Sequence, residues 1–303
     1  MPYDLTSPLV IGISSRALFN LEAENKIYDE QGVEAFSKYQ REHENDVLQK
    51  GPAFQLVEAF LGLNQLGSER LVEVIIMSRN SPDSSLRVFN SIKQYKLDIT
   101  RAALVGGAEI TPYLKAFNTD LFLSAYEHDV KQAVDNGFAA ARIVMGPTHD
   151  NKKIEQIRIA FDGDAVLFSA ESERIFKQGG IQAFMQNEQA HAEEPLGMGP
   201  FAKFLKTLSN LQSVFKDRET APIRTALVTS RNAPAHERPI RTLRAWNVRV
   251  DEAFFLGGVS KTEILSAFGA HIFFDDQDIH TDPASEVVAS AQVPYRQGDN
   301  PNV

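Results

Sequence analysis

The stretch from Gln156 to Phe168 reads QIRIAFDGDAVLF and sets the expectation for the fold. Its first part, Gln156–Phe161, has the length and the apolar, β-branched content of a buried strand. An acidic turn, Asp162-Gly163-Asp164, follows directly. In open α/β sheets ligands bind beyond the carboxyl ends of the strands, so this turn is a candidate functional site.

Similar short apolar runs recur along the chain and alternate with longer amphipathic stretches. This alternation predicts an α/β fold with a mostly parallel, Rossmann-like sheet. The tail from Asp282 shows no clear period. The other predicted strands are Leu9–Ile13, Leu71–Met77, Arg101–Val105, Asp120–Leu123, Ala139–Val144, Thr225–Val228, Ala253–Leu256 and His271–Phe274. The predicted helices are Val33–Glu44, Ala53–Leu63, Ser84–Tyr95, Ile181–His191, Phe201–Leu211 and Arg238–Trp246.

The chain resembles itself at a period of about 150 residues. At a shift of 148 residues Gly51-Pro52 aligns with Gly199-Pro200, and at a shift of 152 Ser78-Arg79-Asn80 aligns with Ser230-Arg231-Asn232. These aligned groups of residues predict an internal duplication of two α/β halves, residues 1–150 and 151–303, joined by a polar linker at Pro147–Lys153. Further aligned pairs are Gly32 with Gly180, Ala35-Phe36 with Ala183-Phe184, His43 with His191, and, at a shift of 151, Gly106-Gly107 with Gly257-Gly258.

Reactive side chains follow several predicted strands of the second half. Asp162 and Asp164 follow the first of these strands, Thr229 and the adjacent Ser230 end the next, and Asp275-Asp276 follow the last. Lys261 lies after the Gly257-Gly258 pair. Because parallel strands end at one edge of a sheet, we expect these groups to lie together.

These residue types suit phosphoryl transfer from a monoester. Hard carboxylate oxygens select Mg²⁺, with Asp162, Asp164, Asp275 and Asp276 as candidate ligands. Asp162 is the candidate nucleophile of an aspartyl-phosphate mechanism, and Asp164 is the candidate acid and base. Lys261 and the Thr229 hydroxyl are expected to hold phosphate oxygens, while Gly163 permits a sharp turn. Taken singly, each residue also fits an ordinary role as a helix cap or a solvated charge.

The first half carries none of these groups at the aligned positions, so one chain is expected to hold one active site. Two interpretations of the first half stay open: it completes the core, or its strand-end residues help to bind the substrate or an effector. The aligned pairs are Asp162 with Ser14, Asp164 with Arg16, Thr229 with Met77, Lys261 with Ile110, Asp275 with Ser124, and Asp276 with Ala125. The candidate substrate-binding residues are Gly163, Ser230 and Arg231 in the second half and Ser14, Arg16, Arg79 and Asn80 in the first.

Composition narrows the class of protein. The 303 residues include no cysteine, which excludes disulfides, thiolate zinc sites and thiol nucleophiles. A formal net charge of −9 disfavours a nucleic-acid polymer as partner. No basic region with an apolar run opens the chain and no apolar run is long enough to span a membrane, so we expect a cytoplasmic location. The number of subunits stays open, a homo-oligomer included.

The order Asp-x-Asp, Thr, Lys, Asp-Asp resembles the four motifs of the haloacid dehalogenase-like (HAD-like) phosphatases. The phrases Ser14–Phe19, Gly51–Phe54, Leu114–Phe117, Phe161–Glu173 and Ile272–Gln277 are similar to the cytosolic 5′-nucleotidase I family. The likeness extends from about Val10 to Tyr295. It implies a HAD-like fold and Mg²⁺-dependent hydrolysis of nucleoside 5′-monophosphates, AMP prominent among them.

The sequence departs from this family after the threonine of the second motif. The run Thr229-Ser230-Arg231-Asn232 departs from the Ala and Arg-Ser-like residues that follow the threonine in animal members, which leaves base preference open.

Residues 172–212 separate the first two motifs and are expected to form a helical cap that excludes water from the site. The alternatives to a nucleotidase are a phosphatase of another small phosphomonoester and a nucleotide-binding regulatory protein.

Overall fold

The computed structural model describes residues 3–144, 154–215, 217 and 220–299, and one ten-stranded sheet runs through both halves of the chain. The predicted linker Pro147–Lys153 lies outside the described residues. The first half contributes β1 (Leu9–Ile13), β4 (Val72–Ser78), β5 (Arg101–Leu104), β6 (Leu121–Ser124) and β7 (Ala139–Ile143). The second half contributes β8 (Ile157–Phe161), β9 (Ile223–Thr229), β10 (Glu252–Phe255), β11 (Ile272–Asp275) and β12 (Ser290–Gln292).

The two halves have the same strand order. The sheet reads β10-β9-β8-β11-β12-β7-β6-β1-β4-β5, so each half places its first strand in the middle and its last strand at the junction. Among the described residues of this ten-stranded sheet, neighbouring strands within a half are parallel, and only β7 and β12, at the junction, pair antiparallel. The prediction of an α/β fold with a mostly parallel sheet, consistent with a Rossmann-like fold, is therefore confirmed.

One row of residues crosses the junction between the halves. Ser124 at the end of β6 pairs with Arg142, Arg142 with Gln292, and Gln292 with Asp275 at the end of β11. The Arg142 guanidinium donates to Gln292 Oε1 at 2.7 Å. Strand ends of both halves therefore lie on the same row of the sheet.

The central strands are continuous apolar runs because helices cover both faces of the sheet. All residues of β1, β4 and β11 are buried. The helices of the first half are α1 (Ser15–Leu18), α2 (Glu22–Glu42), α3 (Phe54–Gly62), α4 (Leu86–Gln94), α5 (Thr111–Ala116) and α6 (Glu127–Asp135). Those of the second half are α7 (Glu171–Ala190), α8 (Ala202–Ser213), α9 (Glu237–Ala245), α10 (Lys261–Phe268) and α11 (Asp278–Ala284). A short ribbon pairs β2 (Phe19–Asn20) with β3 (Gln49–Lys50).

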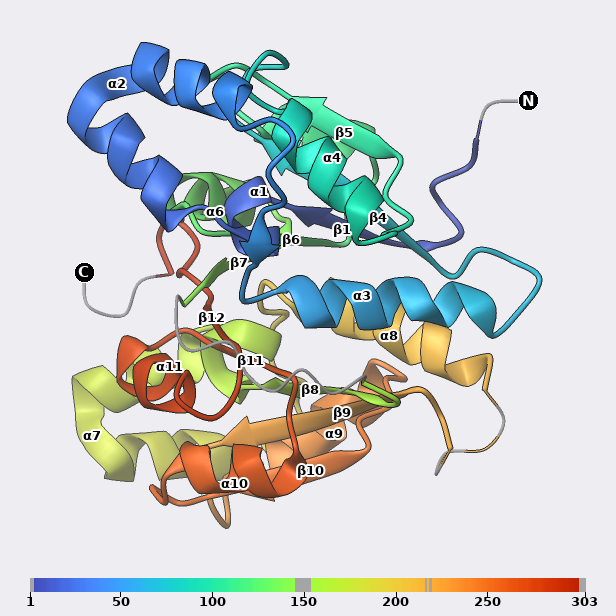
Figure 1. Cartoon of the computed structure of the whole chain (residues 1–303). Helices are drawn as coiled ribbons and strands as arrows, with labels where there is room; N and C mark the ends of the chain where they lie inside the picture. The colour runs from blue at the N-terminus through green and yellow to red at the C-terminus, as the bar shows by residue number, and fades with distance from the viewer. Residues whose placement is uncertain (1–2, 145–153, 216, 218–219, 300–303) are drawn as a thin grey trace.

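The halves exchange contacts through two helices. Helix α3 of the first half contacts β8, and α8 of the second half contacts β1. Figure 1 shows α3 and α8 side by side across the middle of the molecule. Phe60 on α3 and Phe204 on α8 are both buried, which ties the two halves into one hydrophobic core.

Two long helices are interrupted at aligned glycines. Gly32 within α2 has φ 84° and Gly180 within α7 has φ 70°, a backbone region that side chains with a Cβ rarely adopt. The predicted helices Val33–Glu44 and Ile181–His191 describe only the parts after these breaks. The structure adds a helical part before each break.

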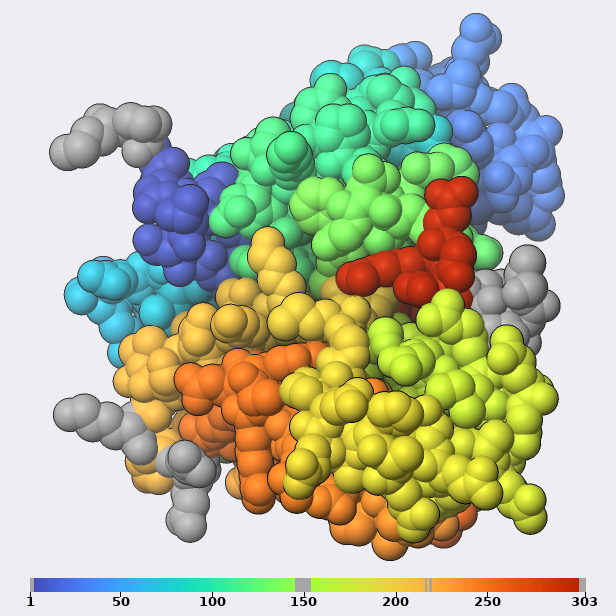
Figure 2. All heavy atoms as spheres, turned by 180° about the vertical axis from the view of Figure 1, so that it is seen from behind, coloured from blue at the N-terminus to red at the C-terminus, as the bar shows by residue number. Residues whose placement is uncertain are grey.

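The segment from Asp282, for which the sequence shows no clear period, contains regular structure. Helix α11 extends to Ala284, and β12 completes the sheet between β11 and β7. The segment after β12, red in Figure 2, lies across the boundary between the halves. There Gln297 donates its backbone N–H to Asp135 of the first half at 2.7 Å. Among the described residues, no helix has the length and apolar character that crossing a membrane requires.

Candidate active site

The acidic turn lies at the carboxyl end of β8. Asp162 donates its backbone N–H to Phe274 on β11 at 2.8 Å and opens a single π turn, Gly163–Leu167. The Asp162 side chain is almost fully buried. A Cβ at Gly163 would lie 3.3 Å from Thr229 Oγ1, so glycine lets the threonine hydroxyl approach the turn. The sequence prediction that Asp162 and Thr229 lie together is consistent with this geometry.

Lys261 joins two of the predicted acids. It begins α10, whose N-terminus is capped by Ser260. Its Nζ lies 2.8 Å from Asp162 Oδ1 and 2.6 Å from Asp275 Oδ2. Burial favours the neutral amine, but the two carboxylates outweigh it and raise the pKa of Lys261. The lysine therefore stays charged between the two acids.

A buried group of carboxylates surrounds this lysine. One oxygen each of Asp162, Asp275 and Asp276 lie within 4.8 Å of one another. Burial raises the pKa of Asp162 to about 7, against the lowering effect of Lys261 and with a further rise from Asp275. Burial and the neighbouring charges of Asp275 and Asp162 raise the pKa of Asp276 well above its usual value. The raised pKa values show that Lys261 alone does not fully stabilise the ionised forms of Asp162 and Asp276.

One oxygen of this group has no hydrogen-bond partner among the residues that the structure describes. Asp276 Oδ1 is buried and makes no hydrogen bond, while Oδ2 accepts from the Tyr295 hydroxyl. A buried carboxylate oxygen without a donor is costly unless a cation or water satisfies it. An all-oxygen acidic site of this kind fits a hard divalent cation such as Mg²⁺.

Asp164 points to a different partner. Both of its oxygens accept from Arg231, Oδ2 from Nε at 2.8 Å and Oδ1 from Nη2 at 2.7 Å. Arg231 is buried, and Asp164 is only partly exposed. The structure thus brings three of the four predicted metal ligands together and pairs the fourth, Asp164, with an arginine. A role for Asp164 as a metal ligand stays a prediction.

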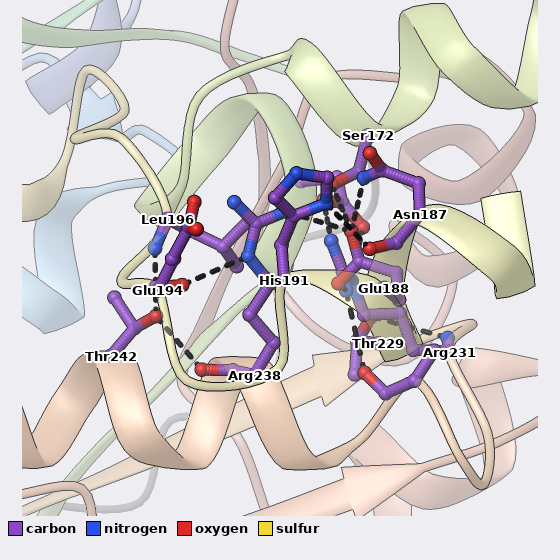
Figure 3. A network of polar contacts seen from close by, with 12 residues as sticks. Ser172, Asn187, Glu188, His191, Glu194, Leu196, Thr229, Arg231, Arg238 and Thr242 are labelled. Atoms are coloured by element: carbon purple, nitrogen blue, oxygen red, sulfur yellow. Dashed lines mark hydrogen bonds and ion pairs between the residues drawn. The ribbon is translucent and has the colours of Figure 1, made fainter.

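The carboxylate of Glu188, on α7, also holds the guanidinium of Arg231 (Figure 3). It accepts from Arg231 and, through Oε1, from Arg238 at 3.1 Å and from the Ser172 hydroxyl at 2.9 Å. The Glu188 side chain is fully buried, and the two guanidinium groups of Arg231 and Arg238 balance its charge. Sequence reasoning missed Glu188 and Arg238. The repeat could have pointed to them, because a shift of 148 residues aligns Glu188 with Gln40 and a shift of 151 aligns Arg238 with Arg87.

Replacing Glu188 with Gln is expected to destabilise the fold by about 3 kcal/mol, because two buried guanidinium groups lose their shared carboxylate. Urea unfolding measures this loss. The matched control is Glu237→Gln, whose pair with Arg241 is about half exposed and contributes less than about 1 kcal/mol. Equal losses in the two variants would contradict the anchoring role of Glu188.

Two other residues missed in the sequence support the acids. His280 Nδ1 lies 3.2 Å from Asp275 Oδ2, and Tyr295 contacts both Asp276 and Glu173. Burial would raise the pKa of Asp275, but Lys261 and His280 outweigh burial and lower it. Tyr295 belongs to the segment from Asp282 that showed no period, and His280 lies just before that segment, so no pattern pointed to either residue.

The structure places the first-half candidates elsewhere. Ser14, Arg16, Arg79 and Asn80 lie at the ends of β1 and β4, and β1 is five strands from β8. At about 4.8 Å between neighbouring strands, the two strand ends are separated by roughly 24 Å along the sheet. Ser230, in contrast, follows Thr229 directly and is exposed at the end of β9.

The predicted cap, residues 172–212, is largely helical and corresponds to most of α7 and α8. Helix α7 supplies Glu188, and α8 contacts the π turn as well as β1. The function of this segment as a cap stays a prediction.

Comparisons with known proteins agree on one family. A family model described as 5′-nucleotidase matches residues 1–300. Cytosolic 5′-nucleotidase 1B from Homo sapiens is 38% identical over 289 residues, which cover 92% of this chain and 47% of that protein. The chain therefore spans about half the length of this curated relative. No solved structure matches the chain.

Proposed function

The chain belongs to the 5′-nucleotidase family, and from this premise we propose that it is a phosphoric monoester hydrolase acting on nucleoside 5′-monophosphates, AMP among them. One observation carries the chemical part of the proposal. Lys261 bridges Asp162 and Asp275 within a buried group of three carboxylates. This arrangement suits a phosphate bound between an ammonium group and a carboxylate nucleophile.

In the proposed mechanism an Asp162 oxygen attacks the phosphorus, and the bond from phosphorus to the 5′ oxygen breaks. Asp164 protonates the leaving nucleoside oxygen and then takes a proton from the water that hydrolyses the aspartyl-phosphate. Since both Asp164 oxygens accept from Arg231, the carboxyl group must turn from Arg231 to act as an acid. Arg231 and Glu188 would thus set the resting position of Asp164.

The remaining groups bind and neutralise the phosphate. Lys261 and the Thr229 hydroxyl would hold phosphate oxygens, with Gly163 and Ser230 beside them. Mg²⁺, held by Asp162, Asp275 and Asp276, would neutralise phosphate charge when bound. The unpartnered Asp276 Oδ1 supports this cation site.

We also infer a HAD-like catalytic half, residues 151–303, and an origin of both halves in one duplication. The identical strand order supports the duplication. So do the breaks at Gly32 and Gly180 and the matching φ angles of the Gly106-Gly107 and Gly257-Gly258 pairs, 57° and 92° against 56° and 92°. The first half, residues 1–150, would be a degenerate copy without catalytic acids.

By analogy with the relative that is named cytosolic, we propose a cytosolic location for this chain.

The test of the proposed function is phosphate release with Mg²⁺ across two panels, the nucleoside 5′-monophosphates and a set of sugar phosphates. We expect release from nucleoside monophosphates, with the sugar phosphates well below them. Preference for sugar phosphates would favour another phosphomonoesterase. No release from either panel, with nucleotide still bound, would favour a nucleotide-binding regulatory protein.

A further inference from the structure

The first half contains a cavity of about 270 Å³ at the carboxyl ends of β1 and β4. Arginine, serine and aromatic side chains line it together. The residues used in the argument below are Arg16, Tyr28, Phe36, Arg79, Ser81 and Tyr126. Its volume is at the small end of ligand cavities, which suits one small molecule.

The cavity occupies the position that corresponds to the surroundings of Asp164 in the second half. At a shift of 148, Tyr28 and Phe36 align with Phe176 and Phe184. Both pairs are edge-to-face, with ring centroids 6.0 Å apart in the first half and 6.3 Å in the second. Arg79 and Arg231 likewise follow aligned strands. The two halves therefore present the same aromatic and arginine framework beside their strand ends.

The charges around the two arginines differ. In the second half Arg231 is enclosed by Asp164 and Glu188, and its side chain is 2% exposed. The aligned positions in the first half hold Arg16 and Gln40. The Arg79 side chain is 39% exposed. It donates to the Gly107 carbonyl at 2.7 Å, and the carboxylate recorded beside it, Asp129, lies at a long 3.5 Å. Its charge is therefore only weakly balanced by that carboxylate, and the exposed part of the guanidinium can bind an anion in the cavity.

Aromatic rings complete a site for a planar group. Tyr28 is 48% and Tyr126 39% exposed. The Arg16 guanidinium, paired with Glu22 at 2.8 Å, lies 5.6 Å from the centroid of the Tyr126 ring. Exposed rings beside an arginine suit stacking with a nucleobase.

We propose that this cavity is a second nucleotide site, which binds a nucleoside phosphate without hydrolysing it. The phosphate is held by Arg79 and neighbouring hydroxyls such as Ser81, and the base packs against Tyr28 and Tyr126. Hydrolysis does not follow, because Ser14 and Ser124 stand where the second half has Asp162 and Asp275. The ligand class rests on the proposed function of the second half, whereas the anion site rests on the cavity itself.

The test counts binding sites in a protein that does not turn over. Calorimetric titration of Asp162→Asn protein with AMP and Mg²⁺ is expected to give two equivalents. Arg79→Gln in the same background is expected to remove one equivalent, and Tyr28→Ala is expected to weaken the same equivalent at least tenfold. The matched control is Arg241→Gln, which removes an exposed arginine of the second half that does not line the cavity and should leave both equivalents. Circular dichroism confirms that each variant is folded.

The same number of AMP equivalents with and without Arg79, at unchanged affinity, would overturn the second site. Phosphate release by wild-type protein is measured in parallel and separates the two proposals. If wild type hydrolyses AMP while Arg79→Gln leaves the titration unchanged, only the second site fails. If wild type hydrolyses no nucleotide while Arg79→Gln removes an equivalent, the second site stands and the proposed function fails.

Discussion

Replacing Asp162 with Asn is expected to lower kcat for AMP by a factor on the order of 10⁴ or more, because the amide cannot form the aspartyl-phosphate. The geometry around position 162 should persist. Asn has nearly the same shape, and Lys261 keeps Asp275 as a partner at 2.6 Å. A loss of this size in a folded protein would identify chemistry rather than structure as its cause.

Stability provides the internal check on that result. Burial raises the pKa of Asp162 to about 7, above the ordinary value of an aspartate. A raised carboxyl pKa means that the ionised form costs stability in the folded state, and this cost grows as the pH rises above the unfolded pKa. A neutral Asn avoids that cost, so the melting temperature at neutral pH should not fall.

Asp83→Asn is the control for this substitution. Asp83 is exposed and pairs with Arg41 at the surface, so the same chemical change should leave kcat unaltered. Phosphate release by Asp162→Asn at the wild-type rate would remove Asp162 from the mechanism.

Chelating divalent cations is expected to abolish turnover, and added Mg²⁺ should restore it. The buried group of Asp162, Asp275 and Asp276 has one ammonium, Lys261, in direct contact. The approach of a phosphate dianion to such a site needs more positive charge than one lysine supplies. Without the cation we expect a loss on the order of 10³-fold or more, since metal stabilisation of phosphoryl charge contributes several kcal/mol.

Cation binding can also be measured without catalysis. Mg²⁺ at about 100 times its Kd should stabilise the folded protein by about 2.7 kcal/mol. Asp276→Asn removes the carboxylate whose Oδ1 accepts no hydrogen bond from the described part of the chain, so this variant should lose most of the Mg²⁺-induced rise in melting temperature. Glu237→Asn, at an exposed position, serves as the control and should keep it. An equal rise in all three proteins, or full turnover in EDTA, would contradict the metal site.

Much of the fold could be predicted because the local pattern and the tertiary structure agree. Strands such as β4 and β9 are buried on both faces and therefore appear in the sequence as apolar runs. Strand β12, in contrast, consists of Ser290, Ala291 and Gln292. These residues have little intrinsic preference for a strand, and β12 forms because β11 and β7 pair with it on either side.

The site was predictable to a similar degree. Parallel strands bring Asp162 and Asp275 to adjacent strand ends, so their proximity follows from topology. The pairing of Asp164 with Arg231 does not, because it depends on side-chain direction across two loops. Glu188 was missed for another reason: a buried glutamate on a helix looks the same in the sequence as an exposed one. The signal that distinguishes it is its alignment with Gln40 in the first half.

The aspartyl-phosphate on Asp162 is the central claim, and trapping it is the most direct test. Wild-type protein turning over AMP with Mg²⁺ is quenched in acid, digested and examined by mass spectrometry. The account predicts the mass of one added phosphoryl group on the peptide that contains Asp162, sensitive to hydroxylamine and absent from Asp162→Asn. Active turnover with no phosphorylated peptide, or with the phosphoryl group on another residue, would contradict it.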